Sequence, residues 1–347
     1  MTARAMNPVE GSPAAERATA VNLPATTATG ASTSATPRPR ALVFAYHDVG
    51  VRCLSVLLSR GIDVALVVTH EDAAGETIWF GSARALCERA GIPCITPAAP
   101  SLDLIEPMLG AKGVDFVFSF YYRQMLPDVL LALGRRGAYN MHGSLLPQYR
   151  GRVPVNWAVL HGECHAGATL HAMVTKPDAG AIVDQQAVPI LDNDSAHEVF
   201  GKVAVAAEIV LERSIGALAA GTATHRTQDL SAGGYFGGRK PADGLIDPRQ
   251  TAWTVHNLVR AVAPPYPGAF MPLSGGELGI LRTWWPARPA QPDNPPAAPA
   301  LLADAGGLWL RCGDGALLQV LEARYNGQPL LATDLEIRFG CTVLTLT

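Results

Sequence analysis

Three polar side chains of this sequence could together carry out an acyl transfer. Asn140 and His142 stand two residues apart in Asn-Met-His, and Asp178 follows in Lys-Pro-Asp-Ala-Gly-Ala. Alternate residues of a strand point to the same face, so the amide of Asn140 and the imidazole of His142 can reach one reacting atom. An amide N–H aimed at a carbonyl oxygen stabilises a tetrahedral oxyanion, and one such donor lowers the barrier by about 3 kcal/mol. Imidazole can move a proton near neutral pH, and a nearby carboxylate favours its charged form.

No serine or cysteine nucleophile stands obviously beside His142, which favours direct transfer to an amine over a covalent intermediate. The spacing of Asn140 and His142 alone has a simpler explanation, because two turn-forming residues often end a strand. The interpretation therefore depends on the elements that surround the pair and on the longer motif that contains it.

The elements that would position these side chains alternate between strand and helix. Residues 137–141 are a short run with few polar side chains, ended by Gly143 and Pro147, and predict a buried strand with the Asn/His pair at its end. Open α/β sheets build their sites at such strand ends. The alternation predicts an α/β fold, a Rossmann-like domain whose mostly parallel sheet is covered on both faces. Further strands are expected at 41–46, 64–68, 116–119, 168–174 and 181–183, and helices at about 51–60, 81–90, 127–133 and 195–220, the last with Asp194 or Ser195 as its N-cap.

The chain divides into four segments by composition. Residues 1–40 consist largely of Ala, Thr, Ser and Pro and predict a disordered N-terminal extension, whereas 41–230 would form the catalytic domain. A Gly-rich, polar stretch at 231–245 predicts a flexible linker. Residues 246–347 contain one helix, at 251–261, and short strands with turn signals, which predict a small OB-like β-barrel domain.

Bulk composition is that of an ordinary soluble protein. The chain has 347 residues, is 48% hydrophobic and carries a formal net charge of −3. Its six cysteines are scattered, which favours reduced thiols and a cytoplasmic location. No apolar run is long enough to predict membrane insertion, and no signal peptide is expected. The first strand is not followed by a Gly-x-Gly-x-x-Gly motif, so NAD is not expected as a cofactor.

The residues around the Asn/His pair resemble a known family. The run from Asn140 to Arg152, Asn-Met-His-Gly-Ser-Leu-Leu-Pro-Gln-Tyr-Arg-Gly-Arg, together with Asp178, is similar to the signature of formyltransferases that use 10-formyltetrahydrofolate. Residues 118–123, 147–157 and 178–183 look like the formyltransferase domain of the bifunctional enzymes of lipid A modification and polymyxin resistance, which formylate UDP-4-amino-4-deoxy-L-arabinose. The C-terminal segments 256–262 and 267–270 are similar to the same enzymes.

This resemblance implies a role for each matching position. Asn140 would stabilise the oxyanion, His142 would transfer the proton, and Asp178 would raise the pKa of His142. The co-substrate would be 10-formyltetrahydrofolate, and the acceptor a nucleotide-linked amino sugar. Acceptor contacts are expected at Tyr121 and Arg260, although Tyr121 could equally pack the end of its strand and Arg260 could be a solvated helical residue. The folate contacts would fall on Gln124, Met125, Leu126, Arg152, Val174, Thr175, Lys176, Pro177 and Asp178.

Other functions remain as alternatives. The bifunctional enzymes carry a second, dehydrogenase/decarboxylase half, so this chain is expected to be a stand-alone formyltransferase with an uncertain acceptor sugar. A methionyl-tRNA formyltransferase would need a basic footprint, yet residues 231–347 hold nine Lys and Arg against nine Asp and Glu, which makes nucleic acid an improbable partner. A non-catalytic folate-binding module is disfavoured by the complete Asn140, His142 and Asp178 set. His161, Cys164, His165 and His171 lack metal-ligand spacing, so no metal is expected.

Overall fold

The structure is a computed structural model that describes residues 38–347, except for 73–74, 76, 274, 290–297 and 347. Most of the predicted disordered extension, 1–40, therefore lies outside the described residues. Within the described part of the chain no helix is long and apolar enough to cross a membrane.

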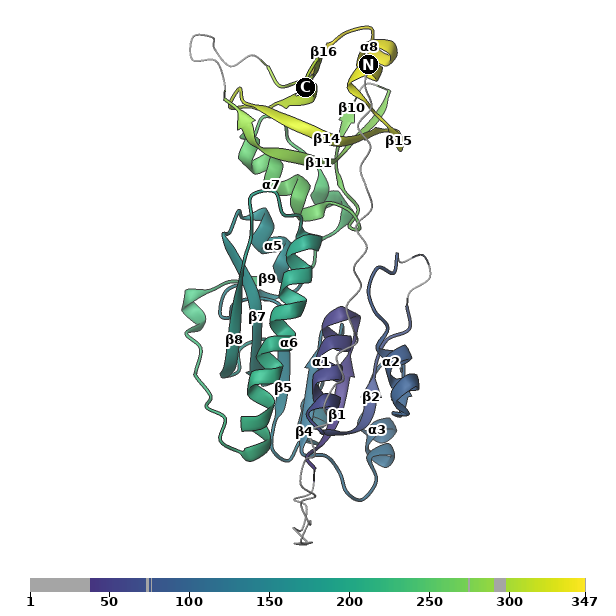
Figure 1. Cartoon of the computed structure of the whole chain (residues 1–347), viewed down its shortest axis with the longest axis vertical. Helices are drawn as coiled ribbons and strands as arrows, with labels where there is room; N and C mark the ends of the chain where they lie inside the picture. Colours follow the sequence, from purple (N-terminus) through teal and green to yellow (C-terminus); the bar gives the residue numbers. More distant parts are fainter. Residues whose placement is uncertain (1–37, 73–74, 76, 274, 290–297, 347) are drawn as a thin grey trace, which may run out of the picture. The chain divides into compact units, whose positions relative to one another are not determined.

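The catalytic domain is built on one seven-stranded sheet in the order β3-β2-β1-β4-β5-β7-β8 (Figure 1). The five strands from β3 to β5 are parallel to their neighbours, whereas β7 pairs antiparallel with β5, and β8 antiparallel with β7. The mostly parallel, Rossmann-like sheet predicted from the sequence is confirmed. The strands are β1 (Arg40–Ala45), β2 (Asp63–Val68), β3 (Cys94–Ile95), β4 (Phe116–Phe120), β5 (Ala138–His142), β7 (His165–Ala172) and β8 (Ile182–Pro189).

Each face of this sheet buries its own apolar layer. Val43 of β1 belongs to a cluster with the inward sides of α1 and α6, which lie side by side in Figure 1. Its neighbour Leu42 belongs to a second cluster with α3 and α4 on the opposite face. Such strands are buried on both sides and read as continuous apolar runs. The helices are α1 (His47–Ser59), α2 (Ala83–Ala90), α3 (Leu102–Leu109), α4 (Asp128–Leu131), α5 (Pro154–Leu160) and α6 (Ala196–Ala220).

Helix boundaries follow local signals where these are strong. Ser195 caps α6 in a capping box with Glu198, as the Ser-x-x-Glu spacing indicates. Two helices of the catalytic domain were not predicted, nor was α8 (Ala332–Phe339) in the C-terminal segment, where only the helix at 251–261 was expected. Helix α3 contains Pro107 in its interior, and α5 follows Val153, whose φ of 47° is left-handed. Proline in a helix interior normally argues against a helix, whereas Val153 only precedes α5, and Pro154 at its first position is a helix-start signal that was not used.

The C-terminal domain is a curled antiparallel sheet in the order β10-β11-β14-β13-β12-β16, with β15 beside β14. It forms an open half-barrel, so the antiparallel β fold is as predicted while a closed OB-type barrel is not seen in the described residues. Gly313-Asp314-Gly315 lies in the turn that joins the antiparallel strands β13 and β14. The elements are α7 (Ala252–Val262), β10 (Ala269–Leu273), β11 (Gly276–Arg288), β12 (Ala300–Asp304), β13 (Gly307–Arg311), β14 (Leu317–Tyr325), β15 (Gln328–Pro329), α8 (Ala332–Phe339) and β16 (Val343–Thr345).

The segment predicted as a flexible linker, 231–245, makes regular contacts with the catalytic domain. Its strand β9 (Tyr235–Phe236) pairs in parallel with β6 (Arg150–Gly151), which directly follows the Asn/His motif. Arg150 is buried and donates through Nη2 to the carbonyl oxygens of Leu230 (3.0 Å) and Gly233 (2.7 Å). This glycine-rich stretch therefore lies against the loop that carries the candidate site.

Candidate active site

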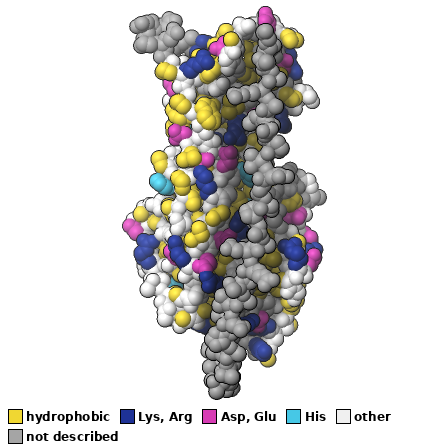
Figure 2. Space-filling model, viewed as in Figure 1, with side chains coloured by type: hydrophobic (Ala, Val, Ile, Leu, Met, Phe, Trp, Pro, Cys, Tyr) yellow, Lys and Arg dark blue, Asp and Glu magenta, His cyan; other side chains and the backbone are white. Residues whose placement is uncertain are grey.

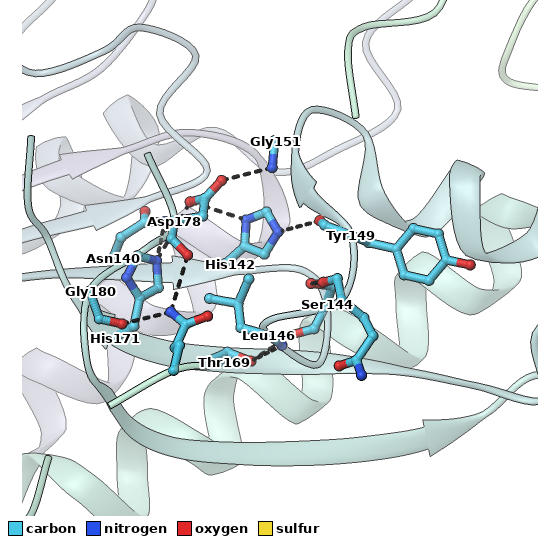
Figure 3. A network of polar contacts seen from close by, with 12 residues as sticks. Asn140, His142, Ser144, Leu146, Tyr149, Gly151, Thr169, His171, Asp178 and Gly180 are labelled. Carbon is cyan, nitrogen blue, oxygen red and sulfur yellow. Dashed lines mark hydrogen bonds and ion pairs between the residues drawn. The ribbon is translucent and has the colours of Figure 1, made fainter. Parts of the chain in front are cut away.

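The structure brings Asn140, His142 and Asp178 together (Figure 3). Asn140 and His142 lie on β5, as the two-residue spacing predicts, and Asp178 lies in the loop between β7 and β8. Because β7 runs antiparallel to β5, its last residue, Ala172, lies opposite Tyr139 near the start of β5, and the loop that follows runs back until Asp178 reaches His142. The carboxylate of Asp178 thus lies beside the imidazole of His142, although the two residues are far apart in the sequence.

His142 and Asp178 form a buried pair. Nδ1 of His142 lies 3.6 Å from Oδ1 of Asp178, and the imidazole is only 6% exposed. Burial lowers the pKa of His142, while the charge of Asp178 and a backbone hydrogen bond oppose this shift. Asp178 thus raises the pKa of His142 as the family resemblance implies, but burial outweighs it. The imidazole is accordingly held neutral and able to accept a proton.

Asp178 itself is kept ionised. Burial alone would raise its pKa, but His142, His171 and the backbone N–H of Gly151 together hold the pKa of Asp178 well below its usual range. The N–H of Gly151 donates to Oδ2 at 2.8 Å. Asp178 has a left-handed φ of 52°, which aspartate tolerates better than most residues, and Gln228 fixes the loop by donating to the carbonyl oxygens of Asp178 and Gly180.

The second nitrogen of His142 contacts the backbone. Nε2 lies 2.9 Å from the carbonyl oxygen of Tyr149. A carbonyl oxygen can only accept, so Nε2 carries a hydrogen and donates it. In the neutral imidazole Nδ1 is then the basic nitrogen, and it faces Asp178. A proton taken up at Nδ1 would be stabilised at once by the carboxylate.

Asn140 is oriented by a second histidine. Its Nδ2 lies 3.2 Å from Nε2 of His171, whose Nδ1 lies 2.9 Å from the carbonyl oxygen of Ala172. A carbonyl oxygen can only accept, so Nδ1 of His171 carries a hydrogen, and an amide nitrogen can only donate, so Nε2 of His171 accepts from Asn140. An amide nitrogen carries two hydrogens, and the second can be donated to a substrate oxygen. This is the arrangement that an oxyanion donor needs.

The predicted folate contacts lie in three places: residues 124–126 after β4, residues 174–178 after β7, and Arg152. The hydroxyl of Thr175 donates to Asp128 at the start of α4, 3.0 Å away, which joins the loop after β7 to the segment after β4. Met125 is 65% exposed in that segment. Gln124 donates to the carbonyl oxygen of Ala98, and Leu126 packs against the apolar cluster behind the sheet. The exposed residues Val174, Lys176 and Arg152 complete the predicted set with the half-buried Pro177.

Tyr121 and Arg260, the two predicted acceptor contacts, have very different surroundings. The hydroxyl of Tyr121 is buried without a hydrogen-bond partner among the described residues, next to Gly143. Arg260 is 4% exposed and donates to Asn257 and to the carbonyl oxygens of Leu191 and Asp194. Its guanidinium therefore serves the contact between α7 and the segment before α6. The alternative of a solvated helical arginine is therefore wrong, and the acceptor contact stays a prediction.

Sequence reasoning missed several residues of the site. Tyr149 acts through its carbonyl oxygen and Gly151 through its N–H, and neither contribution depends on the side chain. His171 was considered as one of four residues that might hold a metal, whereas it lies beside Asn140 in the site. The histidines and the cysteine between 161 and 171 form no group able to hold a metal, and the part of the chain that the structure describes holds no such group elsewhere.

Comparison with known proteins adds the family. Residues 42–215 match the family described as Formyl transferase, and residues 239–335 match its C-terminal domain. The chain belongs to the formyl transferase family. The Asn140, His142 and Asp178 cluster of this family member lies within the first match, and the curled sheet falls largely within the second.

Solved structures share the fold of this formyl transferase. The N-formyltransferase from Helicobacter canadensis, in complex with folinic acid and dTDP-3-aminofucose, has a TM-score of 0.66 at 18% identity, covering 84% of this chain and 100% of that one. WlaRD, a sugar 3N-formyl transferase solved in the presence of dTDP and 5-N-formyl-THF, gives 0.63 at 18% identity, with 85% and 99% covered. A 4-N formyltransferase from Francisella tularensis gives 0.56 at 20%, with 69% and 95% covered.

Proposed function

We propose that this protein transfers the formyl group of 10-formyltetrahydrofolate to the amine of a nucleotide-linked amino sugar. The observation that carries the proposal is the Asn140, His142 and Asp178 cluster, in which an amide donor, a neutral imidazole and an ionised carboxylate meet at one strand end. These are the groups that direct transfer of an acyl group between two nitrogens requires. The cluster lies in a chain of the formyl transferase family.

The reaction follows from this geometry. The acceptor amine attacks the formyl carbon, and the oxyanion of the tetrahedral intermediate accepts a hydrogen bond from Nδ2 of Asn140. His142 takes the proton of the attacking amine at Nδ1, where Asp178 stabilises the imidazolium. The same proton then passes to N10 of the folate as the C–N bond breaks. The products are the formamide and tetrahydrofolate, and no covalent enzyme intermediate forms.

Support for folate as the donor comes from the position of the two loops beside the cluster. The exposed side chains of Met125 and Val174 offer apolar surface, and the hydrogen bond between Thr175 and Asp128 holds the two loops together. A pterin is planar and apolar on its faces, with polar edges that backbone groups can recognise. Two structural relatives were solved with folinic acid or 5-N-formyl-THF. Arg152 is exposed, and its guanidinium suits a negatively charged group of the folate.

Support for a nucleotide sugar as the acceptor comes from a cavity of about 120 Å³ whose lining includes Arg239, Lys240, Asn156 and Tyr266. Two cations suit the diphosphate of such a substrate. The unpaired hydroxyl of Tyr121, beside the residue that follows His142, suits a sugar hydroxyl. UDP-4-amino-4-deoxy-L-arabinose is our first candidate, because of the resemblance of residues 118–123 and 147–157 to the enzymes that formylate it.

The test is a parallel assay of the full chain with 10-formyltetrahydrofolate and three kinds of acceptor. These are UDP-4-amino-4-deoxy-L-arabinose, dTDP-linked 3-amino and 4-amino sugars, and methionyl-tRNA. Release of tetrahydrofolate and the mass of the product report transfer, with His142→Ala as the inactive control. Formylation of a nucleotide sugar is expected. Formylation of methionyl-tRNA alone would overturn the proposal.

Charge argues against the tRNA alternative. Residues 231–347 carry as many acidic as basic residues. On the face seen in Figure 2, Lys and Arg are interspersed with Asp and Glu over the described part of the chain. A tRNA-binding surface would need clustered positive charge to neutralise phosphates.

A further inference from the structure

The loop that follows His142 holds both members of the catalytic pair through its backbone. The carbonyl oxygen of Tyr149 accepts the hydrogen of His142 Nε2, and the N–H of Gly151 donates to Asp178. The position of this loop therefore determines which nitrogen of His142 is basic and where the carboxylate lies. Both contacts are made by main-chain atoms, so they depend on the path of the backbone and not on which side chains the two residues carry.

This loop has a backbone that needs external support. Tyr149 has a φ of 55° and Val153 a φ of 47°, both in the left-handed region. For residues other than glycine this conformation costs about 1–2 kcal/mol each, and it persists only where surrounding structure imposes it. Gly151 has a φ of 102°, and a Cβ there would lie 2.2 Å from the carbonyl oxygen of Phe236. The loop is thus both strained and closely approached by β9.

The support comes from β9 and its flanks. Arg150 N donates to the carbonyl oxygen of Gly234 at 3.1 Å, and Arg152 N to that of Phe236 at 2.9 Å. The ring of Phe236 stacks on the ring of Tyr149, with centroids 5.0 Å apart and planes at 27°. The hydroxyl of Tyr149 donates to Glu163 at 2.6 Å, so its ring is fixed at both ends.

We propose that Phe236 is a positioning residue for catalysis, which sets the proton state of His142 by stacking on Tyr149. Phe236 is far from His142 in the sequence, and its ring contacts Tyr149. In this proposal the ring of Phe236 fixes Tyr149, whose carbonyl oxygen lies 2.9 Å from Nε2 of His142. The inference rests on the proposed formyl transfer for its kinetic readout, but its spectroscopic readout is independent of any substrate.

The kinetic test compares Phe236→Ala with Phe236→Leu, Phe236→Tyr and the matched control Phe339→Ala. Phe339 also packs against a tyrosine, Tyr325, at 5.2 Å, but in the C-terminal domain. Phe236→Ala and Phe236→Leu should lower kcat about 10- to 100-fold, because small misplacements of reacting groups have effects of this size. The KM for 10-formyltetrahydrofolate should change little. Phe236→Tyr, which keeps the ring, should restore kcat, and Phe339→Ala should retain it.

The spectroscopic test uses protein labelled with ¹⁵N in its histidines. In the wild type, His142 should be a single tautomer with its hydrogen on Nε2, whereas in Phe236→Leu the signal should become a mixture of both tautomers. Far-UV circular dichroism confirms that each variant is folded, and Phe236→Leu serves if Phe236→Ala does not fold. A folded Phe236→Leu protein with unchanged kcat and a single Nε2–H tautomer would overturn the inference. An altered tautomer in a protein that formylates no amino sugar would leave the positioning role standing and contradict only the proposed function.

Discussion

Asn140 donates its side-chain amide to Nε2 of His171 across 3.2 Å, and the two residues face each other in the register of β5 and β7. The oxyanion donor that we propose is therefore oriented by a residue on the neighbouring strand. If this contact orients the Asn140 amide for catalysis, the losses of kcat caused by replacing the two side chains should depend on one another.

The double-mutant cycle of Asn140→Ala and His171→Ala tests that dependence. Asn140→Ala should lower kcat about 100- to 1,000-fold, the usual effect of removing an oxyanion donor. His171→Ala should cause a smaller loss, because the amide remains but loses its orientation. The double variant should be no slower than Asn140→Ala alone, as expected for residues that depend on one another. Multiplicative losses, measured in kcat at saturating substrates, would contradict this dependence.

Asp178→Asn tests the electrostatic role of the carboxylate. Asp178 opposes the lowering of the His142 pKa by burial, so its neutralisation should lower that pKa further. The inflection assigned to His142 in the pH dependence of kcat/KM should move to lower pH. The maximal rate should also fall, because the imidazolium formed during transfer loses its counter-ion. A shift of the inflection to higher pH would show that Asp178 acts in another way.

His256 should make stability depend on pH. It is 1% exposed, its two ring nitrogens contact Thr283 and the carbonyl oxygen of Asp192, and burial lowers its pKa from 6.5 to about 4. Between pH 4 and pH 6.5 the unfolded state binds more protons at His256 than the folded state does. The contribution of this residue to the free energy of unfolding is therefore fully present above pH 6.5 and is lost as the pH drops toward 4. The difference corresponds to about 3 kcal/mol.

The measurement is urea unfolding at pH 7.5 and pH 5 for the wild type and for His256→Gln. The glutamine retains a donor and an acceptor but does not titrate, so the variant should lose less stability between the two values. Other groups titrate equally in both proteins, and the comparison cancels them. Equal losses in wild type and variant would contradict the role given to His256.

Gly143 should not accept a side chain. A Cβ at this position would lie 1.9 Å from the Tyr121 hydroxyl, and Gly143 directly follows His142. Gly143→Ala should therefore displace either Tyr121 or the catalytic strand end and lower kcat. Combining it with Tyr121→Phe, which removes the clashing oxygen, should restore part of the loss. A Gly143→Ala enzyme with full activity would show that the contact can relax.

The sequence predicted the fold and the site best where the type of a residue itself indicates its structure or its chemistry. Asn140, His142 and Asp178 are recognisable because amide, imidazole and carboxylate have distinct chemistry, and apolar strands with helices between them predict the sheet. Tyr149 could not be found in this way, because any residue offers a carbonyl oxygen. Its role depends on a left-handed backbone conformation that no feature of the sequence predicts.

The other differences between the predictions and the structure come from contacts between residues that are far apart in the sequence. A solvated helical arginine was the alternative considered for Arg260, but its guanidinium donates to the carbonyl oxygens of Leu191 and Asp194, which are far away in the sequence. The glycines of 231–245 suggested flexibility, whereas here they permit the close approach of β9 to β6. Barrel closure likewise depends on which strands meet, and local turn signals do not determine that.

The antiparallel register of β7 beside β5 has a consequence for how this site tolerates change. Asn140 faces His171 and His142 faces Thr169. A one-residue insertion within β7 would turn His171 to the opposite face and bring an apolar neighbour against Asn140, since side chains alternate along a strand. An insertion in the loop between β7 and β8 leaves that register untouched. That loop carries Asp178, however, and an insertion before it would move the carboxylate away from His142. The number of residues in β7 and the spacing from His171 to Asp178 should therefore both stay constant among functional homologues.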